Sequence, residues 1–371
     1  MSNNSIAVYI GRFSPFHLGH LSVINEALLR SDYLCLAVGS ALAPRSVRNP
    51  FTFIERCEMI RACFDDATNS RIVIVPIQDS IYNEQKWITD VQTAVKESTI
   101  RLGLSATANI SLVGHRKDES TGFYLNMFPT WGSVAVPNFR NINATDIRRA
   151  YFSNIGEMWV HSQEDRIGDR ERDHVIGGPV REWLKTFLLT DAYKMVCDEI
   201  EFIDKYRLQW KNVPYEVIFQ TVDAVVVQAG HVLMIRRGAF PGKGLLALPG
   251  GFLNPRETLE DGMIRELFEE TKIAVPEEIL RANIVATKSF DDPNRSSRGR
   301  TITNAFMIHL PTPKPRIKQR GKPVPVAKLP KVVGSDDADK ALWVPLSDIN
   351  PEMIFEDHAH IINFLTANLD K

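Results

Sequence analysis

Short apolar runs and helical patterns alternate along the first third of the chain, and this alternation constrains the fold more than any other feature. Apolar runs at residues 6–10, 33–40, 71–77 and 110–115 are predicted to be strands, and the segments 20–31, 51–64 and 86–99 between them to be helices. Strands and helices that alternate at this pace predict a doubly wound, Rossmann-like parallel sheet of the α/β class. In such sheets, ligands bind at the carboxyl ends of the strands.

The composition is that of a globular protein with no global charge bias. Of the 371 residues 44% are hydrophobic, and 44 Lys and Arg against 45 Asp and Glu give a formal net charge of -1. Without a basic excess we expect no nucleic-acid partner. No leader pattern and no run of 18 apolar residues is present, so we expect no membrane partner and a cytoplasmic location. Cys35, Cys57, Cys63 and Cys197 lack a paired spacing and are predicted to be reduced thiols.

The chain is long enough for two domains joined by a helical segment. Residues 180–210 contain neither Pro nor Gly and are predicted to be helical, up to Asn212-Val213-Pro214. We therefore predict one domain over residues 1–188, a helical connector over 189–212 and a second domain over 213–371. In the second domain, the Ala229-Gly230 pair between two apolar runs predicts a hairpin. The Pro- and Lys-rich segment 311–331 is predicted to be a solvated surface loop.

The second domain contains the most specific motif, GFLNPRETLEDGMIRELFEETKI at residues 251–273. On a helix Glu266, Glu269 and Glu270 are spaced i, i+3 and i+4, so three carboxylates project from one side. Like charges this close repel one another unless a cation neutralises them. Hard divalent ions prefer oxygen ligands, so Mg²⁺ or Mn²⁺ is the expected occupant. The alternative for a lone cluster of this kind is a solvated acidic helix face.

The same stretch resembles the Nudix box, G-x5-E-x7-R-E-U-x-E-E-x-G-U, where U is apolar. Every signature position is met except the last glycine, which is Lys272 here. A glycine at that place most simply serves as a helix C-cap at positive φ, so the substitution bears on the cap and on no metal ligand. The resemblance implies an α+β Nudix fold, a mixed sheet between helices, and metal-dependent hydrolysis of a nucleoside diphosphate linked to another group.

The resemblance also implies roles for individual side chains. Glu266 and Glu270 would be the core metal ligands, assisted by Glu257 and Glu269, and Arg265 would orient a glutamate. The loop at 289–300 and the segment 355–362 resemble parts of ADP-ribose pyrophosphatases, which makes ADP-ribose the expected substrate. The residues concerned are Arg295, Arg298 and Arg300 in the loop, and Glu356, Asp357 and His358 near the end. Gly250 and Gly251 are also expected to bind ADP-ribose. For each arginine alone, a surface salt bridge is an equally good interpretation.

The first domain has its own motif directly after the first predicted strand, GRFSPFHLGH at residues 11–20. A helix N-terminus carries unsatisfied N–H groups and partial positive charge, so a short strand-to-helix loop suits an anion. His17 and His20 could each donate a hydrogen bond to a phosphate oxygen, and Gly19 would let the pair sit at the helix entry. The alternative is an ordinary turn that contains two histidines. A second helix at residues 143–148 could be capped by Asn143 or Thr145.

Together, G-R-F-x-P-F-H-x-G-H and I-x-x-T-x-I-R resemble the H-x-G-H nucleotidyltransferases, and most closely the archaeal-type nicotinamide mononucleotide adenylyltransferases. The match covers most of residues 5–185, with a polar insertion at 162–174 and Asn143 where the family has serine. It implies adenylyl transfer from ATP, with Mg²⁺ accompanying the ATP. The implied ATP-binding residues are Gly11, Arg12, Phe13, His17, Gly19, His20, Asn143, Thr145 and Arg148, of which His17, His20 and Arg148 are catalytic. The implied mononucleotide-binding residues are Arg48, Asp79, Tyr82, Asn83 and Trp87.

The two halves together resemble bacterial bifunctional proteins that make NAD⁺ and hydrolyse ADP-ribose. The expected small-molecule partners are ATP, nicotinamide mononucleotide, NAD⁺ and ADP-ribose. The sequence is also compatible with a homo-oligomer. One rival is a pantetheine-phosphate adenylyltransferase or a cytidylyltransferase, since these share H-x-G-H. Another is that the Nudix-like half is a non-catalytic ADP-ribose sensor. The intact set of Glu257, Arg265, Glu266, Glu269 and Glu270 argues against the sensor, because a sensor need not keep metal ligands.

Overall fold

The computed structural model describes residues 4–115, 127–163, 174–312, 328–334 and 338–367. The chain divides into two compact units, Met1–Ile200 and Glu201–Lys371. The division falls inside the segment 189–212 that the sequence assigned to a connector. Residues 164–173 of the polar insertion and 313–327 of the predicted Pro- and Lys-rich loop lie outside the described residues.

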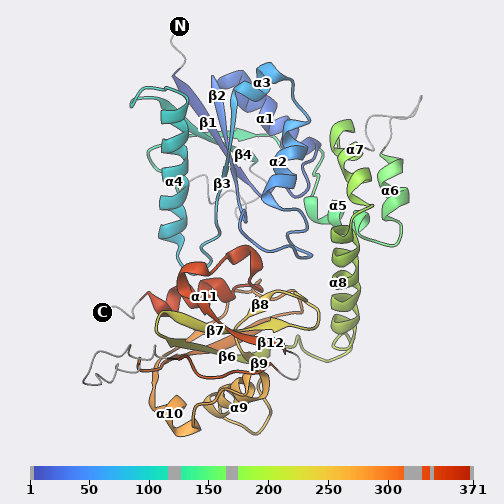
Figure 1. The fold of residues 1–371 in the computed structure, drawn as a ribbon. Helices are drawn as coiled ribbons and strands as arrows, with labels where there is room; N and C mark the ends of the chain where they lie inside the picture. The colour runs from blue at the N-terminus through green and yellow to red at the C-terminus, as the bar shows by residue number, and fades with distance from the viewer. Residues whose placement is uncertain (1–3, 116–126, 164–173, 313–327, 335–337, 368–371) are drawn as a thin grey trace. The chain divides into compact units, whose positions relative to one another are not determined.

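The first unit is built on a five-stranded parallel sheet (Figure 1). Its strands are β1 (Ser5–Gly11), β2 (Tyr33–Val38), β3 (Ile72–Pro76), β4 (Asn109–His115) and β5 (Gly132–Val136), in the order β3-β2-β1-β4-β5. The central strand β1 pairs Val8 with Cys35 of β2 and Ala7 with Ser111 of β4. The predicted Rossmann-like sheet is thereby confirmed.

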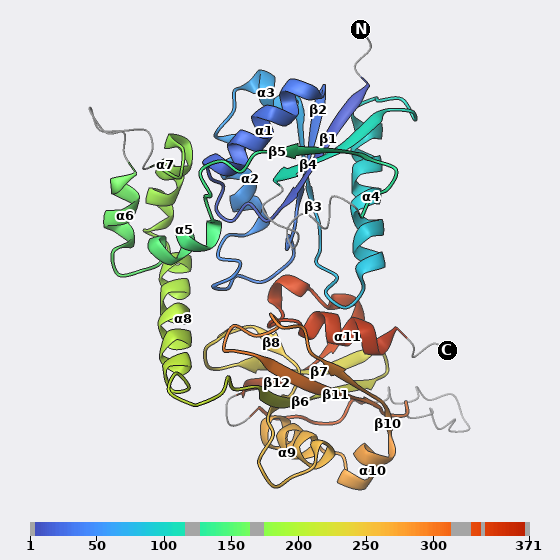
Figure 2. The same ribbon diagram turned by 180° about the vertical axis from the view of Figure 1, so that it is seen from behind.

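Helices cover both faces of this sheet. They are α1 (Leu18–Arg30), α2 (Phe53–Arg61), α3 (Asp66–Ser70), α4 (Glu84–Arg101), α5 (Ala144–Tyr151), α6 (Gly156–Ser162) and α7 (Gly178–Phe187). Successive β1 residues face opposite ways: Val8 packs in the core shared with α4, and Tyr9 in the core shared with α1. Figures 1 and 2 show α4 on one face and α1, α2 and α3 on the other. Burial on both faces explains the continuously apolar strands.

The helical stretch predicted over 180–210 is two helices and not one. Helix α7 ends at Phe187, and α8 (Asp191–Leu208) begins after three intervening residues. The break has a local cause, because the Thr190 side chain accepts a hydrogen bond from the Tyr193 amide at 3.1 Å, which caps a new helix N-terminus. Absence of Pro and Gly therefore did not guarantee continuity. Helix α8 runs across the division between the units, and its residues from Glu201 onward belong to the second.

The second unit is built on a mixed sheet in the order β10-β11-β6-β7-β12, with β8 beside β7 and β9 beside β6. The strands are β6 (Phe219–Gln228), β7 (His231–Arg237), β8 (Leu246–Ala247), β9 (Gly250–Phe252), β10 (Ile284–Phe290), β11 (Thr301–His309) and β12 (Ala338–Pro345). Strands β6 and β11 are parallel, and the other pairs are antiparallel. The predicted hairpin is confirmed between β6 and β7, where Ala229 and Gly230 both have positive φ.

Helices again lie on both faces of the second sheet (Figure 2). Helix α9 (Leu259–Thr271) and the short α10 (Glu277–Ala282) lie on one face, and α11 (His358–Thr366) lies on the other. Two short 3₁₀ turns, η2 (Leu346–Asp348) and η3 (Pro351–Met353), precede α11. Met263 and Leu267 of α9 pack against Val222 and Ala224 of β6 in a fully buried core. This packing holds the acidic side of α9 against the edge of β9.

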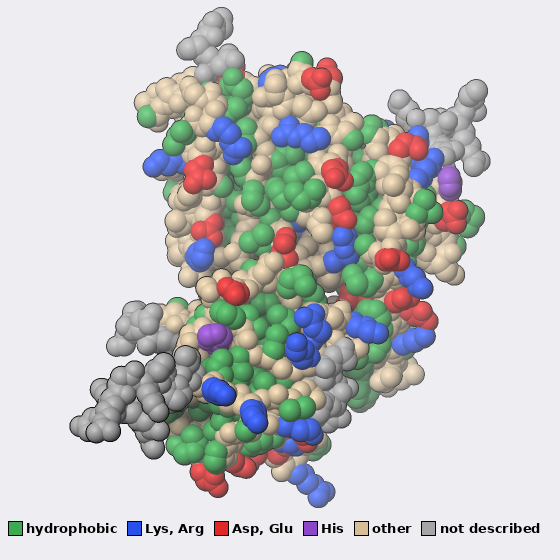
Figure 3. Space-filling view, viewed as in Figure 1, with side chains coloured by type: hydrophobic (Ala, Val, Ile, Leu, Met, Phe, Trp, Pro, Cys, Tyr) green, Lys and Arg blue, Asp and Glu red, His purple; other side chains and the backbone are tan. Residues whose placement is uncertain are grey.

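The surface agrees with the near-zero net charge. Basic and acidic side chains are interspersed with apolar ones over the face drawn in Figure 3.

Among the described residues, no helix is both long enough and apolar enough to cross a membrane. All four cysteines are free thiols, as predicted.

Candidate active sites in the two units

The histidine motif of the first unit lies where β1 ends and α1 begins. His17 is the N-cap of α1, and the two histidines cap one another: the His20 amide donates to His17 Nδ1 at 3.4 Å, and the His17 amide to His20 Nδ1 at 3.3 Å. Their rings are stacked with centroids 3.6 Å apart. Because both Nδ1 atoms accept, each neutral ring carries its proton on Nε2, the tautomer that makes Nε2 a donor.

Gly19 leaves room for this stacked arrangement. A Cβ at position 19 would stand 3.0 Å from Cε1 and Nδ1 of the His17 ring. Phe13, in contrast, has a buried ring that contacts His20 edge-on at 4.9 Å between centroids, so its side chain serves the packing of the loop. Gly11 ends β1, and its carbonyl accepts the Gly39 amide at 2.9 Å. The loop between β1 and α1 is thus fixed by packing and backbone bonds.

The two motifs predicted to share a site do come together. Asn143 caps α5 by accepting the Thr145 amide, and Arg148 of that helix donates to the Ser14 carbonyl at 2.6 Å across 134 positions of sequence. Burial, followed by the positive charges of Arg12 and Arg48, lowers the pKa of Arg148 to about 10. Three guanidinium groups near one another form a strongly anion-attracting surface beside the histidine pair.

Arg56 has a role at this site that the sequence did not reveal. It is fully buried, and its guanidinium donates to the carbonyls of Arg12 (2.8 Å), Gly39 (2.7 Å), Ser40 (3.0 Å) and Thr52 (3.2 Å). Burial lowers its pKa to about 10. One side chain therefore joins the loops that follow β1 and β2.

Four of the residues predicted to bind the mononucleotide, Asp79, Tyr82, Asn83 and Trp87, lie on the loop that follows β3 and on α4, and the fifth, Arg48, lies on the loop that follows β2. Asp79 accepts from the Ser40 amide (3.1 Å) and hydroxyl (2.6 Å), and its charge reaches Arg56. Asn83 caps α4, which gives it a structural function whatever else it contacts. Trp87 is half-buried and packs near Phe128. Asp79 is therefore brought to the anion-attracting surface, whereas Asn83 and Trp87 also serve the fold.

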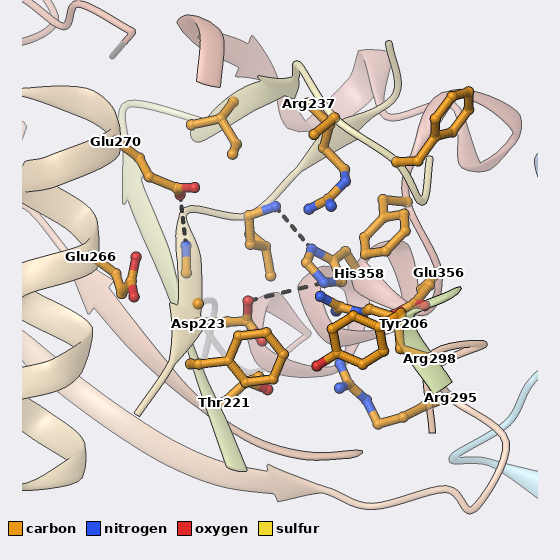
Figure 4. A pocket seen from close by; sticks show the side chains of 18 of the residues that line it. Tyr206, Thr221, Asp223, Arg237, Glu266, Glu270, Arg295, Arg298, Glu356 and His358 are labelled. Atoms are coloured by element: carbon orange, nitrogen blue, oxygen red, sulfur yellow. Dashed lines mark hydrogen bonds and ion pairs between the residues drawn. The ribbon is translucent and has the colours of Figure 1, made fainter. Parts of the chain in front are cut away.

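The second unit contains a cavity of about 490 Å³ whose walls include Glu266, Glu270, Gly250, Gly251 and Arg265. Figure 4 shows Glu266 and Glu270, both from α9, on one side of it. The Gly250 amide donates to Glu270 at 2.9 Å. A Cβ at Gly251 would lie 2.5 Å from the Glu266 carboxylate, so that carboxylate would have to move. Gly251 therefore leaves room for Glu266, while Gly250 donates to Glu270.

Arg265 binds three of the four predicted metal-site carboxylates. It holds Glu257 with two bonds (2.7 and 3.0 Å) and reaches Glu266 and Glu269 at 2.8 Å each. The first of these contacts lowers the pKa of Glu257 to about 2. The predicted ion pair between Arg265 and a glutamate is thus a branched one. Among the described residues, no group of three or more His, Cys, Asp or Glu side chains is already arranged to surround a metal.

Glu266 and Glu270 have the electrostatics of a cation site. Burial raises the pKa of Glu270 to about 8, and the charge of Glu266 adds to the rise. Burial likewise raises the pKa of Glu266, against the opposing effect of Arg265. A nearby cation would favour the charged form of both carboxylates, and hard divalent cations prefer oxygen ligands of this kind. The donor set of the described residues therefore fits the metal that the motif implies.

Lys272 replaces the motif glycine without changing the backbone. It is the C-cap of α9 at φ 43° and ψ 40°, in the left-handed region, and its amide donates to the Phe268 carbonyl at 3.0 Å. The predicted positive-φ cap is thus formed by a lysine.

The far side of the cavity is built on a buried ion pair. Arg295 holds Asp357 through two bonds of 2.8 and 2.9 Å, with both side chains almost fully buried. The sequence predicted either a surface salt bridge or a ligand contact for Arg295, and neither interpretation included a buried ion pair with Asp357. Arg298 lies over the Phe252 ring, 5.2 Å from its centroid, and lines the cavity. Arg300 donates to the Asp291 carbonyl.

Asp223 and His358 lie between the two sides of the cavity (Figure 4). His358 Nδ1 accepts the Leu248 amide at 2.9 Å, and its Nε2 is 4.0 Å from Asp223. Asp223 also accepts from Thr303 at 2.5 Å. Burial lowers the pKa of His358, which keeps the ring neutral. Asp223 was missed from the sequence, because a lone aspartate in an apolar strand carries no motif.

Comparisons with known proteins agree with both halves. A model of the NUDIX domain matches residues 218–365, and a Cytidylyltransferase-like model matches residues 8–120. A nicotinamide/nicotinic acid mononucleotide adenylyltransferase of Acinetobacter baylyi is 40% identical over 39% of this chain and 74% of its own length. A nicotinamide-nucleotide adenylyltransferase of Thermococcus onnurineus is 28% identical over 53% of this chain and 91% of its own.

Solved structures of a bacterial protein match nearly the whole chain. One is the structure of a bifunctional NMN adenylyltransferase/ADP ribose pyrophosphatase from Francisella tularensis, complexed with AMP and a manganese ion, with a TM-score of 0.83. The two chains are 33% identical over 98% of this chain and 99% of the other. Both motif sets lie inside the matched length. The chain therefore belongs to the family of bifunctional NMN adenylyltransferases/ADP-ribose pyrophosphatases.

Proposed function

We propose that the first unit transfers the adenylyl group of ATP to nicotinamide mononucleotide, giving NAD⁺ and pyrophosphate, and that the second hydrolyses ADP-ribose to AMP and ribose 5-phosphate. The observation that carries the proposal is that one chain combines the His17, His20 and Arg148 cluster with the Glu266 and Glu270 pair. A relative with both activities in its name aligns over almost the full length.

In the first unit no protein nucleophile is needed. The 5′-phosphate oxygen of the mononucleotide attacks the α-phosphorus of ATP, and the bond from that phosphorus to the pyrophosphate oxygen breaks. His17 and His20 donate from Nε2 to the phosphates, with His20 nearest the developing charge, and Arg148 holds the β- and γ-phosphates. Arg12 and Arg48 add positive charge, while Asp79, Tyr82, Asn83 and Trp87 bind the mononucleotide. Mg²⁺ enters with ATP, so no all-protein cage is needed.

In the second unit Glu266 and Glu270 would hold a divalent cation, assisted by Glu257 and Glu269, with Mg²⁺ or Mn²⁺ as the ion. Such an ion, when bound, polarises the diphosphate and lowers the pKa of a water molecule. Arg265 orients Glu257, Glu266 and Glu269 around it. Arg298 faces the cavity and supplies positive charge for the substrate. No covalent intermediate is required.

A substrate panel on the full chain tests both assignments. Pyrophosphate release from ATP is measured with nicotinamide mononucleotide, with nicotinic acid mononucleotide and with pantetheine phosphate as acceptors. AMP release from ADP-ribose is measured with and without Mg²⁺. We expect turnover with the pyridine mononucleotides and metal-dependent hydrolysis of ADP-ribose. Pyrophosphate release with pantetheine phosphate but with neither pyridine mononucleotide would contradict the first assignment. ADP-ribose hydrolysis that is unaffected by Glu270→Gln would contradict the second.

A further inference from the structure

The second half of α8 lines the same cavity as the glutamates of α9. Phe202 and Tyr206 are one helical turn apart, on one face of the helix, and both belong to the second unit. Figure 4 shows Tyr206 on the side of the cavity opposite Glu266 and Glu270, next to Arg298. The NUDIX domain match begins only at residue 218, after this helix. The segment predicted to be a connector thus supplies part of a pocket wall.

This aromatic wall is anchored to the domain. Tyr206 packs on Phe219 of β6 with ring centroids 5.8 Å apart, and Phe202 lies 6.4 Å from Phe240. Arg207 donates twice to the Ser297 carbonyl, at 2.5 and 3.1 Å, in the loop that carries Arg298. Phe202 is nevertheless 37% exposed. An aromatic side chain that is held in place and turned toward a cavity is suited to a flat ligand group.

The layout of the cavity decides which part of a substrate reaches this wall. A diphosphate bound near Glu266 and Glu270 lies at one end, and the polar side chains of Asp223 and His358 lie in the middle. Of the two groups that flank the diphosphate of ADP-ribose, only the adenine is aromatic. Stacking on aromatic side chains stabilises a base without selecting among bases.

We propose that Phe202 and Tyr206 of α8 form the subsite for the aromatic base of the Nudix substrate, so that the pocket selects nucleoside diphosphate compounds over diphosphates without a base. This assignment rests on the proposed hydrolysis of ADP-ribose. It makes α8 a functional part of the second unit, and it predicts that specificity depends on residues outside the Nudix box.

The test compares full-length Phe202→Ala, Tyr206→Ala and Tyr206→Phe with Lys205→Ala, an exposed neighbour on the same helix that pairs with Glu201. The readouts are KM and kcat for ADP-ribose, and competitive inhibition of that hydrolysis by AMP and by ribose 5-phosphate. Competition reports on this pocket alone, so AMP bound elsewhere does not interfere.

We expect each alanine variant to weaken ADP-ribose and AMP binding by roughly 5- to 150-fold, the range for loss of one stacked aromatic, chiefly through KM. Tyr206→Phe should restore affinity because the ring remains, and Lys205→Ala should match the unchanged chain. Inhibition by ribose 5-phosphate should not change. Equal weakening of both inhibitors, or unaltered AMP inhibition in both alanine variants, would overturn the subsite. If the protein without substitutions does not hydrolyse ADP-ribose, the proposed function on which the subsite rests would be overturned instead.

Discussion

Replacement of Lys272 by glycine should stabilise the second unit without changing its chemistry. Lys272 holds φ 43° and ψ 40° at the end of α9, and its side chain is exposed. An L-residue in this region costs roughly 1–2 kcal/mol, because Cβ crowds the following carbonyl oxygen. Glycine removes that cost, but its greater conformational freedom stabilises the unfolded chain by about 0.4–1 kcal/mol. The net expectation is an unfolding free energy higher by about 0.5–1 kcal/mol.

Thermal unfolding followed by circular dichroism or calorimetry measures this effect. For a unit of this size, a gain of that magnitude raises Tm by about 1–4 °C. Ala229→Gly is the matched control, since Ala229 has a positive φ of 49° in the β6–β7 turn of the same unit and should gain similarly. Lys205→Gly, within α8, should lose about 1 kcal/mol. ADP-ribose hydrolysis should be unchanged in Lys272→Gly. A lower Tm for Lys272→Gly alongside a higher one for Ala229→Gly would refute the strain argument.

Three further predictions concern the two sites. His20→Ala should lower adenylyl transfer about 100-fold or more, as expected for loss of one donor to developing charge, and leave ADP-ribose hydrolysis nearly intact; equal loss of both activities in steady-state assays would contradict two independent sites. Arg56→Lys leaves buried carbonyls unsatisfied, so it should lower the unfolding free energy of the first unit by about 3 kcal/mol and raise the KM for ATP. An unchanged unfolding temperature of the first unit in calorimetry would count against this role. Burial raises the pKa of Glu270 to about 8, so below that pH Mg²⁺ must displace a proton, and its apparent affinity should fall about tenfold per pH unit from 8 to 6 and level off above 8. Metal titrations that are flat over this range, or that keep the slope in Glu270→Gln, would contradict that account.

The sequence was sufficient where chemistry is encoded by local spacing. The i, i+3, i+4 carboxylates, the H-x-G-H turn and the Ala229-Gly230 hairpin each specify a backbone shape within a few residues, and each is found as predicted. The doubly wound sheet also followed, since apolar strands of regular spacing must be buried on both faces. The carboxylate spacing, the histidine turn and the hairpin depend on contacts near in sequence, whereas the sheet followed from the apolar pattern of its strands.

Sequence reasoning failed where a residue acts through partners far along the chain. Arg56 meets the carbonyl of Arg12, 44 positions away, and Arg295 meets Asp357 across 62 positions. An arginine has the same appearance in a sequence whether it is solvated or buried against carbonyls. The helix break at Thr190 was missed for another reason, because a side-chain cap inside a Pro- and Gly-free stretch leaves no compositional mark.

Arg148 and Glu270 show the same principle with opposite charge. Glu270 is buried and Arg148 is half-buried, and their hydrogen bonds go to neutral partners: Arg148 to the Ser14 carbonyl and the Thr145 hydroxyl, and Glu270 to the Gly250 amide. In both, burial disfavours the charged form, lowering one pKa to about 10 and raising the other to about 8. A fold selected only for stability would pair or expose such groups. Arg237 offsets only part of this cost for Glu270. The ligands that we propose have the complementary sign, polyphosphate beside Arg148 and a divalent cation beside Glu270, so their binding would offset the cost of each buried charge.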